Sequence, residues 1–225
     1  MHTHTHGKKV KPLPKYDLKG IYPNKKCISS SQFKSYEESP AQFYLEYVLG
    51  IRKPPTVKML QGVIFSALYA DRTLDHAHHL HECGAPARVA EIFEKVIKRF
   101  PIQKGGQPEY PLKAKHRGWT FRATLDDYVH HRRFIVENKT GEAEWTQERV
   151  DADDQVTFQV WCHWKKHKEM PDGGILNWVD LRKNSTQRLK TFPIYRTVKQ
   201  MLQFEERVNR VIDNLEANNF TTSLY

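Results

Sequence analysis

Apolar residues recur three and four positions apart in several stretches of the chain, which is the spacing of one helix face. The clearest stretch is 87–100, which Pro101 ends. Its apolar face comprises Val89, Ile92, Phe93, Val96, Ile97 and Phe100. The same period predicts helices over 31–37, 39–50, 56–68, 150–167 and 198–218.

The pattern changes in the middle of the chain to short alternating or β-forming runs. Strands are predicted over 109–115, 120–129 and 133–140, with turns near 117–118 and 130–132. A further strand is predicted over 175–182. Helices, a strand meander, a helix, a strand and a closing helix together predict one α/β domain with its sheet covered by helices.

Length and composition favour a soluble protein of one domain. The chain has 225 residues, enough for one buried core. No run approaches the roughly 18 apolar residues of a membrane span, and the first residues contain no apolar signal segment. Cys27, Cys83 and Cys162 are odd in number and far apart, which favours reduced thiols. We expect a cytoplasmic protein (in the host cytoplasm if viral) without a membrane partner.

The net charge is +10, from 36 basic and 26 acidic residues. Residues 1–30 hold seven lysines against one acid, and 182–199 hold six basic residues and no acid. Clustered positive charge is typical of proteins that bind a polyanion, although a solvated basic face is an equal alternative. We interpret 1–26 as a flexible basic arm and 27–225 as the folded domain.

The segment 122–141 predicts a hairpin that brings acidic side chains together. A loop of two residues or of four gives the same register, in which paired residue numbers sum to 263. Asp126 then lies opposite Glu137, with Cβ atoms roughly 4.5–5.5 Å apart. Side chains alternate along a strand, so Lys139 shares the face of Glu137 while Asn138 points away.

Two carboxylates this close repel, and one takes up a proton unless a cation lies between them. Mg²⁺ suits such a site because it prefers oxygen ligands and keeps several waters, and Mn²⁺ can substitute for it. Lys139 would then contact the attacking water or the phosphate. The alternative from spacing alone is a surface ladder of salt bridges, Asp126 with Lys139 or Glu137 with Arg133.

Five short motifs follow one another between residues 29 and 165. They read SSSQFKSYEESPAQFYLEYVLG from 29, GVIFS from 62, ATLD from 123, IVENKTG from 135 and DQVTFQVW from 154. In this order they resemble the motifs of PD-(D/E)xK nucleases, in the RecB-like and phage-exonuclease branch. The resemblance implies a restriction-endonuclease-like core, a central mixed sheet flanked by helices.

The resemblance also implies a role for each matching position. Asp126, Glu137 and the backbone carbonyl of Asn138 would be metal ligands, and Lys139 would orient the nucleophilic water. Gln155 would hold the active-site backbone or contact DNA. Two further candidates are Glu109, on the preceding strand, and Ser66, which stands where the family often has a ligating histidine. The basic residues that we expect to contact DNA are Arg182, Lys183, Arg188 and Lys190.

Several positions depart from the family pattern. Ser66 replaces the usual histidine, Gln159 the usual tyrosine and Ala123 a glycine. Ser39 stands where iron–sulfur members have cysteine, and no cysteine cluster follows, so no iron–sulfur cluster is expected.

The function that these features favour is a Mg²⁺-dependent DNA nuclease, an exonuclease before a structure-specific endonuclease, in recombination, repair or phage DNA metabolism. DNA is the expected partner, with a recombination or single-strand-binding protein and self-association as further options. The rival hypothesis is a DNA-binding module that keeps the nuclease fold without catalysis.

Twelve histidines raise a third hypothesis, a zinc-stabilised structural protein. His79 and Cys83 lie four residues apart, as do His163 and His167. Neither pair belongs to a CxxC or HExxH motif, so we expect solvated or DNA-facing histidines.

Overall fold

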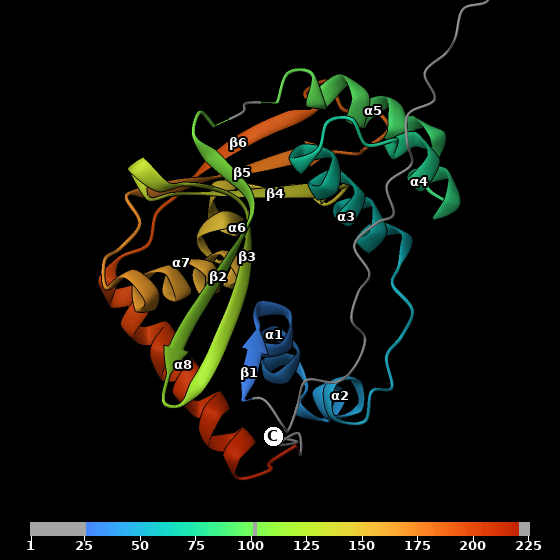
Figure 1. Ribbon diagram of the computed structural model, residues 1–225. Helices are drawn as coiled ribbons and strands as arrows, with labels where there is room; N and C mark the ends of the chain where they lie inside the picture. Colours follow the sequence, from blue (N-terminus) through green and yellow to red (C-terminus); the bar gives the residue numbers. More distant parts are fainter. Residues whose placement is uncertain (1–25, 101–102, 221–225) are drawn as a thin grey trace, which may run out of the picture.

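The computed structural model describes residues 26–100 and 103–220 as one α/β domain (Figure 1). Its strands are β1 (Cys27–Ser29), β2 (Gly106–His116), β3 (Trp119–Val129), β4 (Phe134–Gly141), β5 (Gly173–Asp180) and β6 (Leu189–Ile194). Its helices are α1 (Ser30–Glu38), α2 (Pro40–Phe43), α3 (Val57–Ala70), α4 (His76–Glu82), α5 (Ala87–Ile97), α6 (Gln147–Asp151), α7 (Asp154–His167) and α8 (Val198–Glu216), with a π-helical turn at Tyr44–Val48 and a 3-10 turn at His130–Arg132. The expected arm over 1–26 lies outside the described residues, apart from Lys26.

The six strands form one mixed sheet in the order β1-β3-β4-β5-β6, with β2 also paired to β3. The pairs of β1 with β3 and of β4 with β5 are parallel, and the other pairs are antiparallel. A central mixed sheet flanked by helices confirms the predicted fold class.

Strand β3 changes its partner partway along one edge. Strand β2 pairs with one edge of β3 from end to end, with a break at Glu109 and Asp126, so β1 and β4 share the other edge. On that edge β1 pairs with residues 120–122 and β4 pairs with residues 127–129. No strand pair is described there for residues 123–126, and the backbone of this gap has to find other partners.

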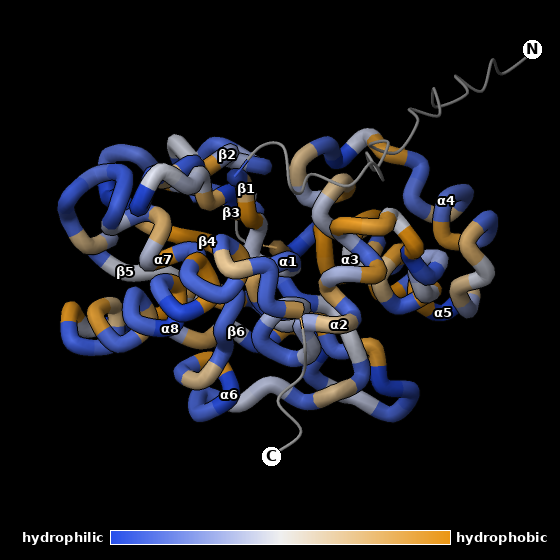
Figure 2. Tube along the Cα trace, turned by 90° about the horizontal axis from the view of Figure 1, so that it is seen from below, coloured by the Kyte–Doolittle hydropathy of each residue, from blue (hydrophilic) through white to orange (hydrophobic). Residues whose placement is uncertain are grey.

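Two hydrophobic cores hold the helices to the sheet. The larger lies between the sheet and α1, α7 and α8, and includes Phe33, Phe121, Phe158 and Trp161. The smaller joins α3, α4 and α5 to the end of β5 through Phe65, Phe93 and Val179. Figure 2 shows α3, α4 and α5 on one side of the molecule, with α7, α8 and most of the sheet on the other.

Local capping explains where several helices begin. Ser29 and Thr197 form capping boxes at α1 and α8, and Thr56 caps α3. The helix expected over 150–167 is divided into α6 and α7 because the Asp153 side chain accepts the Val156 N–H and starts α7 there. The sequence patterns did not predict β1 or β6.

Among residues 26–100 and 103–220, no helix combines the length and the apolar character that crossing a membrane requires.

Candidate active site

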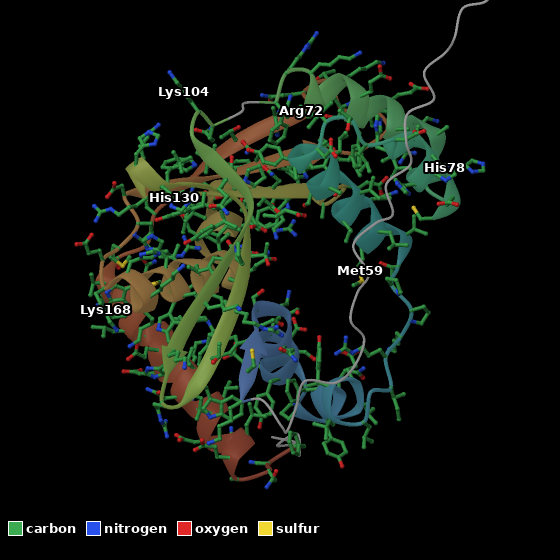
Figure 3. All side chains as sticks on the ribbon, viewed as in Figure 1. Met59, Arg72, His78, Lys104, His130 and Lys168 are labelled. Carbon is green, nitrogen blue, oxygen red and sulfur yellow. The ribbon has the colours of Figure 1, made fainter. Side chains whose placement is uncertain are left out.

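The hairpin of β3 and β4 has the register that the sequence predicts. The paired residues are Asp127 with Val136, Tyr128 with Ile135, and Val129 with Phe134, and each pair of numbers sums to 263. The four-residue form of the loop is observed: a 3-10 turn over 130–132 followed by a residue with left-handed backbone (φ 43°). His130 marks this loop in Figure 3.

The ladder ends one pair before Asp126 and Glu137, because β3 leaves β4 at this point. The Asp126 side chain takes the place of a backbone partner here: its Oδ2 accepts the backbone N–H of Asn138 at 2.6 Å. Its Oδ1 accepts the hydroxyl of Ser66, from α3, at 3.2 Å. Asp126 thus bridges the diverging strand β4 and helix α3.

Helix α7 holds the second acid from the other side. Glu137 is 3% exposed, and its Oε1 accepts from Lys139 Nζ at 2.7 Å and from Gln155 Nε2 at 2.6 Å. Lys139 Nζ also donates to Gln155 Oε1 at 2.7 Å. Gln159, one turn further along α7, donates to Glu137 Oε2 at 2.6 Å. Glu137, Lys139 and two amides therefore form one hydrogen-bonded group, and Asp126 lies beside it through its bond to the Asn138 backbone, between Glu137 and Lys139 in the chain.

The electrostatics of this group show an excess of negative charge in a desolvated place. Burial and, next to it, the nearby Glu137 carboxylate raise the pKa of Asp126 to about 8, although the Asn138 amide, Lys139 and Ser66 act to lower it. Burial acts to lower the pKa of Lys139, but Glu137 outweighs it and the net pKa is raised. One lysine does not compensate both acids, so a further cation would keep both ionised.

The donor set fits a hard divalent cation. Asp126, Glu137 and the Asn138 carbonyl are all oxygen donors, as Mg²⁺ prefers, and Mg²⁺ fills its remaining positions with water or phosphate. The Asn138 side chain points away as predicted: its Oδ1 accepts from Asn177 on β5 at 3.0 Å. In the described chain, no group of three or more histidine, cysteine, aspartate or glutamate side chains is placed to hold a metal ion.

Among the other predicted residues, Ser66 and Gln155 join the group and Glu109 does not. Ser66 donates to Asp126 at 3.2 Å. Glu109 is exposed, has left-handed backbone (φ 50°), and has no described hydrogen bond or ion pair with either acid.

The predicted DNA contacts at the end of the sheet already have intramolecular partners. Arg182 and Lys190 both form ion pairs with Glu144, at 3.1 and 2.8 Å. Arg188 donates to backbone carbonyls, including that of Lys183 at 3.3 Å. Lys183 itself is exposed, with no ion pair among the described residues. Contact of these four residues with DNA stays a prediction.

Gln159 is the site residue that sequence reasoning missed. The motif that this stretch resembles has tyrosine at this position, so the sequence alone indicates only a departure from that motif. Yet Gln159 is 1% exposed and donates both to Glu137 and, at 3.3 Å, to the carbonyl of Thr124 in the unpaired stretch of β3. The available signal was its spacing: Gln155 and Gln159 lie four residues apart and therefore share a helix face.

The histidine pairs have local partners. His163 is buried and its Nε2 lies 2.8 Å from the hydroxyl of Tyr128. His79 is 5% exposed, and the Cys83 thiol donates to the carbonyl of Leu80 at 3.3 Å. Because His79 and His163 are both buried, the expectation of solvated or DNA-facing histidines is wrong for these two residues.

Comparison with known proteins identifies similar folds. No family model and no curated protein matches the chain. A candidate exonuclease from Eubacterium rectale has a TM-score of 0.64 and 13% identity, covering 94% of this chain and 89% of that one. LHK-Exo, solved in complex with dAMP, has a TM-score of 0.53 and 15% identity, covering 86% and 90%. At such identities the comparisons establish a shared fold.

Proposed function

We propose that this protein is a Mg²⁺-dependent DNA nuclease, an exonuclease before an endonuclease. The observation that carries the proposal is the hydrogen-bonded group of Glu137, Lys139 and Gln155 with the Asp126 carboxylate beside it, which combines two oxygen-ligand acids with a lysine. The shared fold with a candidate exonuclease and with LHK-Exo, which binds dAMP, supports the same reaction class. Recombination, repair and phage DNA metabolism are the processes in which such an enzyme would act.

Each residue has a role that its contacts allow. Asp126, Glu137 and the Asn138 carbonyl would hold the ion, which supplies Lewis acidity and neutralises charge on the phosphate. Lys139 would release Glu137 to orient the attacking water and to stabilise the negative charge that develops on the phosphate. Gln155 binds both Lys139 and Glu137, and so fixes their relative positions.

The test is cleavage of labelled linear duplex and of covalently closed circular DNA, with and without Mg²⁺. We expect cleavage of the linear duplex alone, abolished by EDTA, and restored by Mg²⁺ or Mn²⁺. Lys139→Ala should lower kcat by at least about 10²-fold. Lys165→Ala is the matched control, because Lys165 is similarly exposed (18% against 20%) and also pairs with a glutamate, but lies outside the site.

Three outcomes separate the alternatives. Cleavage of the closed circle would identify an endonuclease. DNA binding without metal-dependent cleavage would identify the binding module that has lost catalysis. Equal kcat in Lys139→Ala and Lys165→Ala would refute the assigned centre.

A further inference from the structure

A cavity of about 550 Å³ adjoins the candidate active site. It lies between the first turns of α3 and α5 and the turn that follows β4, and Lys139 is part of its wall. Met59, labelled in Figure 3, marks the first turn of α3. A second cavity, of about 430 Å³, is lined by Gln155. Because Lys139 and Gln155 are hydrogen-bonded to each other, the candidate centre adjoins both cavities.

The wall of the first cavity contains polar groups without partners. Gln61 is 7% exposed, and its side chain has no hydrogen bond among the described residues. The Nε of Arg88 is buried and also lacks an acceptor in this part of the chain. Buried donors without acceptors are costly, and native proteins keep few of them. A ligand rich in acceptor oxygens would satisfy the buried Nε of Arg88, and would also accept from the Gln61 amide, whose polar atoms are not fully buried.

The charge of the cavity wall is positive. Lys58 and Arg149 line it, are exposed, and have no acidic partner in residues 26–100 or 103–220. Arg88 forms an ion pair with Glu142 at 2.7 Å, so its charge is partly neutralised. The first turn of α5 adds to this charge, because its N-cap residue Pro86 provides no side-chain acceptor for the free backbone N–H groups. An anionic ligand is therefore favoured over a cationic or neutral one.

The cavity also has an apolar side. Val57, Val89 and Leu181 line it together with Trp145, over whose ring the Arg149 guanidinium lies at 4.3 Å. Its volume is within the range of about 300–1,000 Å³ that small-molecule sites occupy. A wall that combines positive charge with apolar and aromatic surface matches a nucleotide, which joins an anionic phosphate to a sugar and a flat base.

We infer that this cavity binds the nucleotide next to the scissile phosphate. Lys58 and Arg149 contact its phosphate, while Gln61 and Arg88 donate to its sugar or base oxygens. The inference rests on the proposed function, since it is Lys139 that connects the cavity to the cleavage site. A DNA strand bound in this way passes across the candidate active site toward the second cavity.

The first test separates this subsite from the chemistry. Lys58→Ala and Arg149→Ala should each raise KM for an oligonucleotide about tenfold, with kcat within twofold. Both should leave hydrolysis of bis(p-nitrophenyl) phosphate, which has no nucleotide, within twofold. Lys95→Ala is the matched control, because Lys95 is an exposed lysine on α5 outside the cavity. It should leave KM and kcat unchanged for both substrates. Unchanged KM in both cavity variants would overturn the inference.

The second test measures binding alone, so that it does not depend on catalysis. In EDTA, the anisotropy of a fluorescent oligonucleotide should give a Kd about tenfold higher for Lys58→Ala than for Lys95→Ala. The slope of log K against log salt should also fall by about one for each phosphate contact removed. If wild type fails to cleave but this difference holds, the nuclease proposal fails and the subsite stands. If wild type cleaves and the Kd values are equal, the subsite fails alone.

Gln61→Leu distinguishes a ligand contact from a structural one. Because Gln61 has no partner within the protein described here, leucine should leave the Tm equal or raise it. Oligonucleotide binding should nevertheless weaken at least threefold. A lower Tm with unchanged binding would identify Gln61 as a structural residue and contradict its place in the subsite.

Discussion

Gln159→Leu should weaken both the fold and the proposed metal site, because Gln159 donates to Glu137 Oε2 and also to the backbone of β3. Its Nε2 lies 2.6 Å from Glu137 Oε2 and 3.3 Å from the carbonyl of Thr124. Gln159 is 1% exposed and Glu137 is 3% exposed, so water does not readily replace the lost donor. Leucine has a similar volume and keeps the packing of α7.

The magnitude follows from these contacts. A hydrogen bond to a charged group contributes about 1.5–3 kcal/mol, and the long bond to Thr124 contributes less. The Oε1 of Gln159 is buried without a partner, so leucine also removes one unsatisfied acceptor. We therefore expect a net loss of about 1–2 kcal/mol in the free energy of unfolding. Loss of a group that orients a metal ligand typically costs about 10–100-fold in metal affinity, and we expect the Mg²⁺ concentration for half-maximal cleavage to rise by that factor.

Urea unfolding measures the first effect, and Mg²⁺ titration of cleavage measures the second. Gln203→Leu, on the exposed side of α8, provides the control for the chemistry of the substitution. If Gln159→Leu has the same Mg²⁺ half-saturation as wild type, Gln159 does not position Glu137 for metal binding. If its unfolding free energy matches that of Gln203→Leu, the buried hydrogen bonds do not stabilise the fold.

Two further predictions concern buried polar groups outside the site. Tyr69→Phe removes the hydroxyl that donates to Asp127 at 2.7 Å, and Asp127 is only 2% exposed. Urea unfolding should therefore show a loss of about 1–2 kcal/mol in the free energy of unfolding. A loss below about 0.5 kcal/mol would contradict this prediction. Burial lowers the pKa of His163 to about 4, below its usual value of about 6.5. Between these two pH values the unfolded state binds more protons than the folded state. The free energy of unfolding therefore falls as the pH falls from about 6.5 to about 4. Between pH 7 and pH 5 we expect urea unfolding to show a loss of about 1–2 kcal/mol in the free energy of unfolding. The loss should be smaller in His163→Gln. An equal loss in both proteins would show that other groups cause it.

The parts of the site that the sequence predicted depend on local rules. The hairpin register follows from the turn and the period-two alternation of one continuous segment, so it could be predicted without the rest of the chain. The same alternation placed Lys139 on the face of Glu137, and their hydrogen bond at 2.7 Å confirms it. Gln155 came from the resemblance, and its contacts with both residues agree with the role of holding the site.

The parts that it did not predict depend on distant partners. Strand β1 has three residues and pairs with β3 more than 90 positions later, so no local pattern marks it. Strand β6 lies inside the basic stretch 182–199 and has mostly polar or half-buried residues, as edge strands often do. The ion pairs of Arg182 and Lys190 with Glu144 join residues 38 and 46 positions apart, and composition does not reveal such pairs.

The change of partner along β3 explains why the fold and the candidate site share the same residues. Where β1 has ended and β4 has diverged, backbone groups lose their ladder partners, and side chains replace them. The Asp126 carboxylate accepts the Asn138 N–H, and the Gln159 amide donates to the Thr124 carbonyl. Substitution of these residues should therefore cost stability as well as activity, so a loss of cleavage alone does not identify a metal ligand. A change in Mg²⁺ dependence, measured in a variant that stays folded, does.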